Sequence, residues 1–126
     1  MTNHLHLVCQ TSEPFKLSAF VRDFKKHTAK SLLKCIWEEP ESRRSWILSA
    51  LREAGKYDNR ITNYTFWQEG CHLIQLHNNE IIDQRINYIH ENPVRAMIVA
   101  NAEDYLFSSA TNYASLGGIV DVEVIR

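Results

Sequence analysis

Two histidines in the opening stretch, His4 and His6, could together hold a metal ion. They stand two positions apart, and side chains alternate between the faces of a β-strand, so in a strand both imidazoles would point to the same side. Neutral imidazole is a common ligand of divalent transition metals. Such a pair is more often two half-exposed polar side chains, and taken alone it favours that interpretation. Other residues of the chain must therefore decide between the two.

A tyrosine and an asparagine on a later helix, Tyr88 and Asn92, form the second candidate group. Asn78 and Asn79 are both suitable caps, and the isoleucine spacing predicts a helix from Glu80 to about Glu91. The helix should end at Asn92, because the proline that follows disfavours helical geometry there. A spacing of four places Tyr88 and Asn92 on one side. A phenol can act as a nucleophile, although a tyrosine at a helix border more often packs against the core with its hydroxyl in water.

The segment from Lys16 to Lys34 combines an apolar stripe with a basic face. Apolar residues recur every three or four positions from Leu17 to Ile36, which predicts an amphipathic helix ending near Trp37. Six basic residues and one acidic residue lie in this segment, although the whole chain has a net charge of −1. Such a face is either an ordinary solvated helix surface or a surface that contacts phosphates, and the segment leaves both open. The candidates for phosphate contact on it are Arg22, Lys25, Lys26 and Lys30.

Length and composition limit the class of protein. A chain of 126 residues predicts one domain, residues 1–126, and its 44% hydrophobic and 23% charged residues are typical of a soluble globular protein. The net charge of −1 excludes a uniformly basic nucleic-acid binder but not a local basic face. Three cysteines without paired spacing indicate neither a disulfide framework nor a cysteine metal site, and they favour the reducing cytoplasm. No apolar run is long enough to cross a bilayer, so no membrane partner is expected.

The remaining elements are predicted from turn residues, helix breakers and runs of β-branched or aromatic residues. After Pro40, apolar spacing predicts a second helix that stops at Gly55 and buries a stripe made of Trp46, Ile47, Ala50, Leu51 and Ala54. A polar loop should follow at residues 56–63, and a short helix is predicted at 109–114. The predicted strands, besides the opening stretch, are residues 64–67, 72–76 and 119–125.

Two strings of the sequence together resemble a known family. The string Met1-Thr2-Asn3-His4-Leu5-His6-Leu7-Val8 and the string Tyr88-Ile89-His90-Glu91-Asn92-Pro93-Val94-Arg95-Ala96 are similar to the two signature motifs of the single-tyrosine HUH transposases. Within that superfamily the chain looks most like the REP-associated tyrosine transposases, which act on single-stranded DNA hairpins. The resemblance covers nearly the whole chain, and the order and separation of the two motifs make it fairly specific.

The resemblance implies a metal-dependent DNA transposase that cleaves and rejoins single-stranded, hairpin-forming DNA through a 5′-phosphotyrosine intermediate. By it, His4 and His6 would hold a divalent metal, Mg²⁺ or Mn²⁺, with Asn92 as a third polar ligand. Tyr88 would be the nucleophile, and Arg95 would join the basic face in binding DNA. The implied fold is α/β of the α+β type, a ferredoxin-like antiparallel sheet with helices on one face.

The start of the chain departs from the family pattern. Family members carry a strand, a helix and another strand before the histidine motif, whereas here Met1 lies within that motif and Thr2 replaces the usual proline. We therefore expect an N-terminally truncated fold in which the opening strand lacks sheet partners. Its open edge could pair with a second copy to give a homodimer.

Two other functions remain open from the sequence. A catalytically inactive remnant of such a transposase would keep the basic face at Lys16–Lys34 and bind DNA hairpins without cutting them. A structural metal module or interaction domain would bind no nucleic acid and would show no salt-dependent affinity for single-stranded DNA.

Overall fold

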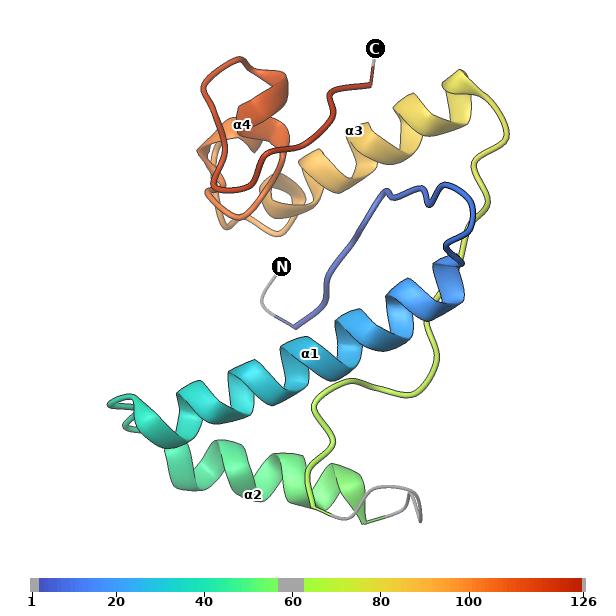
Figure 1. Cartoon of the computed structure of the whole chain (residues 1–126). Coiled ribbons are helices and arrows are strands. Elements are labelled where there is room, and N and C mark those ends of the chain that lie inside the picture. The colour runs from blue at the N-terminus through green and yellow to red at the C-terminus, as the bar shows by residue number, and fades with distance from the viewer. Residues whose placement is uncertain (1–2, 57–62, 126) are drawn as a thin grey trace. The chain divides into compact units, whose positions relative to one another are not determined.

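The computed structural model describes residues 3–56 and 63–125, which form two compact units. Unit 1 combines Met1–Cys9 with Ile74–Arg126, and unit 2 is Gln10–Leu73. Among the helices of the described residues, none combines the length and apolar character that a membrane-spanning segment needs. The helical elements in chain order (Figure 1) are α1 (Leu17–Glu38), α2 (Arg44–Gly55), α3 (Asn79–Arg95), the 3₁₀ helix η1 (Ala102–Asp104) and α4 (Ala110–Tyr113).

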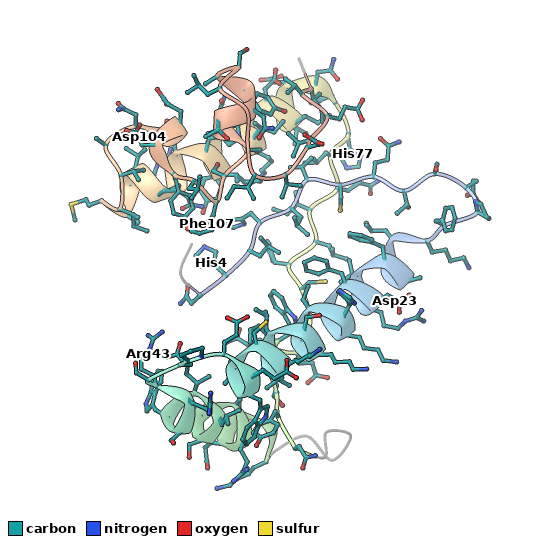
Figure 2. The ribbon with its side chains drawn as sticks, turned by 60° about the vertical axis from the view of Figure 1, so that its left-hand side comes forward. His4, Asp23, Arg43, His77, Asp104 and Phe107 are labelled. Atoms are coloured by element: carbon teal, nitrogen blue, oxygen red, sulfur yellow. The ribbon has the colours of Figure 1, made fainter. Side chains whose placement is uncertain are left out.

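Unit 2 is built on α1 and α2, which lie side by side and run in opposite directions in both views (Figures 1 and 2). The two predicted helices are confirmed. Their junction is held by Arg44, whose guanidinium donates hydrogen bonds to the carbonyl oxygens of Ile36 (2.7 Å) and Glu39 (2.6 Å). These carbonyls lie at the end of α1, where the helix itself supplies no partner, so Arg44 satisfies them.

The aromatic segment at residues 64–67 was predicted as a strand, and this prediction is wrong. Its residues pack against α1 as irregular chain: Trp67 donates from Nε1 to the Thr28 hydroxyl at 3.0 Å, and its ring lies 6.1 Å from that of Phe24. Aromatic residues favour strands because they fit half-buried surfaces, and a helix offers such a surface too. Most of the polar loop predicted at residues 56–63 lies outside the described residues.

In unit 1, α3 begins at the predicted cap, where Asn78 Oδ1 accepts a hydrogen bond from the Ile81 amide at 2.9 Å. The predicted end at Asn92 is wrong, because α3 continues through Pro93 to Arg95. Pro93 is buried with Ile86 and His90 at helical spacing, and this packing offsets the local cost of the proline.

A Schellman motif ends α3. The amide of Ile98 bonds the Pro93 carbonyl and the amide of Met97 bonds the Val94 carbonyl, both at 2.9 Å, with Met97 at φ 55°. The motif repeats after α4, whose predicted position is confirmed. There the Leu116 amide bonds the Thr111 carbonyl, and the residue at φ 60° is Ser115. Left-handed backbone usually selects glycine, and neither helix has it at that position.

The C-terminal segment, predicted as a strand at residues 119–125, is irregular and is tied to α4 by side chains. Asn112 Nδ2 donates to the Val120 carbonyl at 3.2 Å, and the Tyr113 hydroxyl accepts from the Ile125 amide at 3.1 Å. Gly118 sits against the Asn112 side chain with no room for a Cβ atom. Asn112 and Tyr113 thus satisfy backbone groups that a neighbouring strand would otherwise pair.

Residues 3–56 and 63–125 contain no β-strand, so the predicted ferredoxin-like antiparallel sheet is absent and the fold is helical. The opening stretch, 72–76 and 119–125 have strand-like sequences, but a strand exists only where a second backbone pairs with its amide and carbonyl groups. No two of these segments pair in the described part of the chain. The strand-like composition of these segments is therefore not sufficient to form a sheet.

The buried core of the described residues is small, with Leu48 in unit 2 and Ile86 and Ala110 in unit 1 as its hydrophobic members. The prediction that Trp46 is buried on α2 is wrong, since 69% of its surface is exposed. Helix α1 has no buried residue, and even its apolar stripe is partly open to solvent. Much of the apolar surface of both units is therefore available for contact.

Candidate active site

Unit 1 brings the opening segment onto α3, so that residues from the two sequence motifs meet. His6 and Asn92 are 86 positions apart, and Asn92 Nδ2 lies 3.2 Å from His6 Nε2. The ring of Tyr88, one helical turn before Asn92, is 5.9 Å from the His6 ring and nearly perpendicular to it. The ring of His4 is 4.9 Å from that of His6. Two imidazoles, a phenol and an amide therefore form one cluster.

The hydrogen bonds of the cluster determine which imidazole nitrogens carry protons. His4 Nδ1 lies 2.8 Å from Asn3 Oδ1, and an amide oxygen only accepts, so His4 Nδ1 is the donor and Nε2 keeps its lone pair. The amide nitrogen of Asn92 only donates, so His6 Nε2 is the acceptor. In this arrangement each ring has an unprotonated Nε2, the form that binds a cation, and the Nε2 of His6 is the one that accepts from Asn92.

The environment also favours the neutral form of His6. Partial burial lowers the pKa of His6 below its usual value, and the nearby charge of His4 lowers it further. A ring with a lowered pKa remains unprotonated in more acidic solution than an ordinary histidine does. His6 is therefore suited to accept a proton or to bind a cation at neutral pH.

Tyr88 is accessible, with 43% of its surface exposed, so it is not a core-packing tyrosine. The guanidinium of Arg95 lies over its ring, 5.6 Å from the centroid. This contact exists because α3 continues past Pro93, which places Arg95 two turns after Tyr88 on the same side. These two groups could act on one phosphate ester: the phenol could attack the phosphorus, and the guanidinium could bind a phosphate oxygen.

An apolar hollow of about 370 Å³ lies beside the cluster and is lined in part by His6. Leu5 and Leu7 line it from the opening segment, and Ile86 and Ile89 line it from α3. His90 borders the hollow and is buried, with Nε2 2.9 Å from the Ser109 hydroxyl. Burial lowers the pKa of His90 and the charge of Glu91 partly opposes this.

The donor set of the cluster fits a divalent cation. His4 Nε2 lies opposite the Nδ1 atom that bonds Asn3, and rotation of the Asn92 amide would free His6 Nε2 and present Oδ1 in place of Nδ2. Residues 3–56 and 63–125 contain no group of three His, Cys, Asp or Glu side chains placed to hold a metal. An ion here would rest on two imidazoles and one amide, leaving positions for phosphate and water oxygens.

The basic candidates on α1 belong to unit 2 and differ in availability. Lys25 donates hydrogen bonds to the carbonyls of Gln68 (3.2 Å) and Gly70 (2.5 Å), which anchors the chain after Trp67 and occupies the ammonium group. Arg22 binds the carboxylate of Asp23 at 2.8 Å. Lys26 and Lys30 are exposed. The sequence places all four on one helix but does not reveal that Lys25 has a structural role.

Two features of the sites were missed by sequence reasoning. The side chain of Asn3 orients the ring of His4 through a hydrogen bond. The sequence indicates this role only by placing an asparagine directly before His4. Phe15 and Phe20 are exposed, at 72% and 42% of their surfaces, although Phe20 belongs to the apolar stripe of the helix predicted from Leu17 to Ile36. Their signal is the alternation of aromatic and basic residues near Lys16.

The fold and the cluster define a helical protein with a candidate metal and phosphoryl-transfer site. Comparisons of the chain with protein-family models, with curated proteins and with solved structures found no match.

Proposed function

We propose that this chain is a metal-dependent DNA transposase that cleaves and rejoins single-stranded, hairpin-forming DNA through a 5′-phosphotyrosine intermediate. The observation that supports it best is the meeting of His6, Asn92 and Tyr88, which come from distant parts of the sequence. These are the residues that the resemblance to single-tyrosine HUH transposases assigns to metal binding and nucleophilic attack.

The proposed reaction is a transfer of one phosphoryl group. Tyr88 Oη attacks the phosphorus of a DNA phosphodiester and forms a new P–O bond, while the bond from phosphorus to the preceding 3′-oxygen breaks. The phenolic proton is lost and the departing 3′-oxygen gains a proton, so the products are a 5′-phosphotyrosine and a free 3′-hydroxyl. Attack by another 3′-hydroxyl on this linkage reverses the step, and no ATP is needed because one phosphoester replaces another.

The side chains around Tyr88 have separate roles. His4 and His6 would hold a divalent ion such as Mg²⁺ or Mn²⁺ through Nε2, and Asn92 would hold it through its amide oxygen once the amide has rotated away from His6. When bound, the ion would withdraw charge from a non-bridging phosphate oxygen and make phosphorus more electrophilic. Arg95 is placed to bind a second phosphate oxygen beside the attacking phenol.

Covalent capture tests the proposal. The full chain is incubated with a pool of single-stranded oligonucleotides that carry a hairpin and randomised flanks, with Mn²⁺ or Mg²⁺. We expect an adduct that survives denaturation, and peptide mass spectrometry should place it on Tyr88. Tyr88→Phe should abolish the adduct, because the attacking oxygen is removed, and chelation of the metal should do the same. Tyr105→Phe is the matched control and should leave the adduct unchanged.

The outcomes separate the enzyme from its alternatives. An adduct that persists in Tyr88→Phe, or that forms equally well in chelator, contradicts the proposed mechanism. Salt-dependent binding of the hairpin with no adduct supports the catalytically inactive remnant instead. An absence of any binding to single-stranded DNA contradicts both.

A further inference from the structure

Unit 2 contains a groove that the proposed chemistry does not use. It has a volume of about 640 Å³ and lies between the turn before α1 and the first half of that helix. A hydrogen bond of 2.9 Å from the Phe15 amide to the Ser12 carbonyl closes the turn. The residues that matter for its chemistry are Phe15, Lys16, Phe20, Asp23, Phe24 and His27.

Aromatic rings are the main apolar surface of this groove. Phe15 and Phe20 are exposed, and the ring of Phe20 lies 6.0 Å from that of Phe24 with the two planes inclined by 29°. Phe24 in turn packs on Trp67, which is fixed by its hydrogen bond to Thr28. The exposed rings are thus backed by an ordered aromatic cluster, and Phe15 and Phe20 keep accessible surfaces for a flat partner.

The face of α1 that lines the groove continues as a basic stripe. Phe20, Asp23 and His27 follow one another at spacings of three and four, and the same line continues to Lys30 and Lys34. At 1.5 Å per residue, Lys30 lies about 15 Å along the axis from Phe20. Along this line Lys30 is the first cationic side chain after the aromatic rings, and Lys34, one turn further on, lies 3.8 Å from the Glu38 carboxylate.

The acidic residue in the groove is neutralised locally. The Asp23 carboxylate is bound by Arg22 at 2.8 Å, and this hydrogen bond lowers the pKa of Asp23. Lys26 also lies close enough to lower it. A polyanion approaching the groove thus meets Lys16 at one end, Lys30 at the other and a compensated carboxylate between them.

We propose that this groove binds unpaired bases of single-stranded DNA, with Phe15 and Phe20 stacking on the bases and Lys16 and Lys30 contacting the phosphates. Stacking on aromatic side chains together with a cationic track is how proteins bind single strands with little sequence preference. The site rests on the single-stranded DNA substrate proposed above and adds a place for bases that are not being cut. Duplex DNA fits poorly, because its bases are stacked on one another and expose only their edges.

Binding measurements with an uncleaved strand test the groove separately from the chemistry. Fluorescence anisotropy with a labelled oligothymidylate is measured for the Tyr88→Phe chain in chelator, so that neither the nucleophile nor a metal contributes. Phe15→Ala should weaken binding about 5- to 100-fold, the cost of one lost stacking contact. Phe15→Leu should weaken it similarly because it retains apolar bulk without a ring. Trp46→Ala, which removes an equally exposed ring on α2, is the matched control and should have no effect.

Salt dependence tests the phosphate contacts. Lys30→Gln should reduce the slope of log affinity against log salt by about 0.7, the value for one phosphate contact with a single strand. Lys56→Gln, at the end of α2 where the lysine pairs with Glu53, should leave the slope unchanged. NMR should show upfield shifts of the Phe15 and Phe20 ring protons on binding, and unfolding curves of each variant establish that the fold is intact.

Three results would overturn the inference. Equal affinity for a duplex of the same length contradicts base stacking. Retention of full affinity in both Phe15→Ala and Phe15→Leu shows that the groove is not used. The chain could instead bind an acidic peptide more tightly than oligothymidylate. If that binding is lost in Phe15→Ala and kept in Phe15→Leu, the groove belongs to a protein partner. A failed adduct assay with normal groove binding would overturn only the proposed chemistry.

Discussion

The two units of the chain assemble their polar surfaces in different ways. In unit 2 the aromatic and basic side chains follow one another along α1, so a single helix positions them. In unit 1 the imidazoles of the opening segment meet Asn92 and Tyr88 of α3, and the contacts between the two segments, including the hydrogen bond from Asn92 to His6, hold them together. Side chains on one helix keep their spacing when the packing around that helix weakens. A cluster formed by distant segments loses its geometry when the packing between them weakens.

The largest expected change in stability comes from truncating a large buried side chain in each unit. Ile86 and Leu48 are each 7% exposed, and truncation of either to alanine should lower the free energy of unfolding by about 2–5 kcal/mol. Ile86 lines the same apolar hollow as residues of the opening segment. Loss of its side chain should therefore also separate His6 from Tyr88, whereas Leu48→Ala should not. Amide hydrogen exchange measures the loss for each helix, and nuclear Overhauser contacts between the two rings report the cluster. Loss of those contacts in Leu48→Ala would show that the contrast between the units is false.

A smaller effect is expected at the end of α3. Met97 has a φ of 55° and is 91% exposed, so Met97→Gly removes backbone strain without removing packing and should stabilise unit 1 by about 1 kcal/mol. The control is Ser31→Gly within α1, which should destabilise unit 2 by about 0.5–1 kcal/mol because glycine there adds freedom to the unfolded chain. Urea unfolding followed by circular dichroism and tryptophan fluorescence measures both. A destabilising Met97→Gly would contradict the observed helix end.

The smallest expected effect is a difference in pH dependence. Burial lowers the pKa of His90 in unit 1, so between that value and the unfolded value of about 6.5 the unfolded chain binds more protons. Unit 1 should therefore lose stability as pH falls below about 6.5, and should show no such loss above it. In unit 2 the lowered pKa of Asp23 comes from Arg22 on an exposed surface, so its small contribution should persist until pH falls below about 4.

Unfolding midpoints measured across this pH range test the difference. His90→Gln should reduce the pH dependence of unit 1, since one titrating group is removed while a partner for Ser109 remains, and the lowered pKa of His6 should leave a dependence of the same sign. Equal loss of stability in both units near neutral pH would contradict the assignment to His90.

The helices were predictable because their signals are local. The spacing of apolar residues located α1 and α2, and the asparagine caps at Asn78 and Asn79 located the start of α3. The end of α3 was not predictable from the proline rule, because burial of Pro93 with Ile86 and His90 offsets a local preference. The position of Arg95 over Tyr88 depends on the continuation of α3 past Pro93, so this contact was not predictable from the sequence either.

The sequence by itself determined which residues can do chemistry and which segments form helices, because residue type and helical spacing are local properties. Only the tertiary structure decided that the strand-like segments remain unpaired, that Lys25 is bound to the carbonyls of Gln68 and Gly70, and that His6 reaches Asn92. Each of these outcomes depends on a partner elsewhere in the chain. A strand needs a second backbone, and a site built from distant segments needs the apolar packing that brings them together.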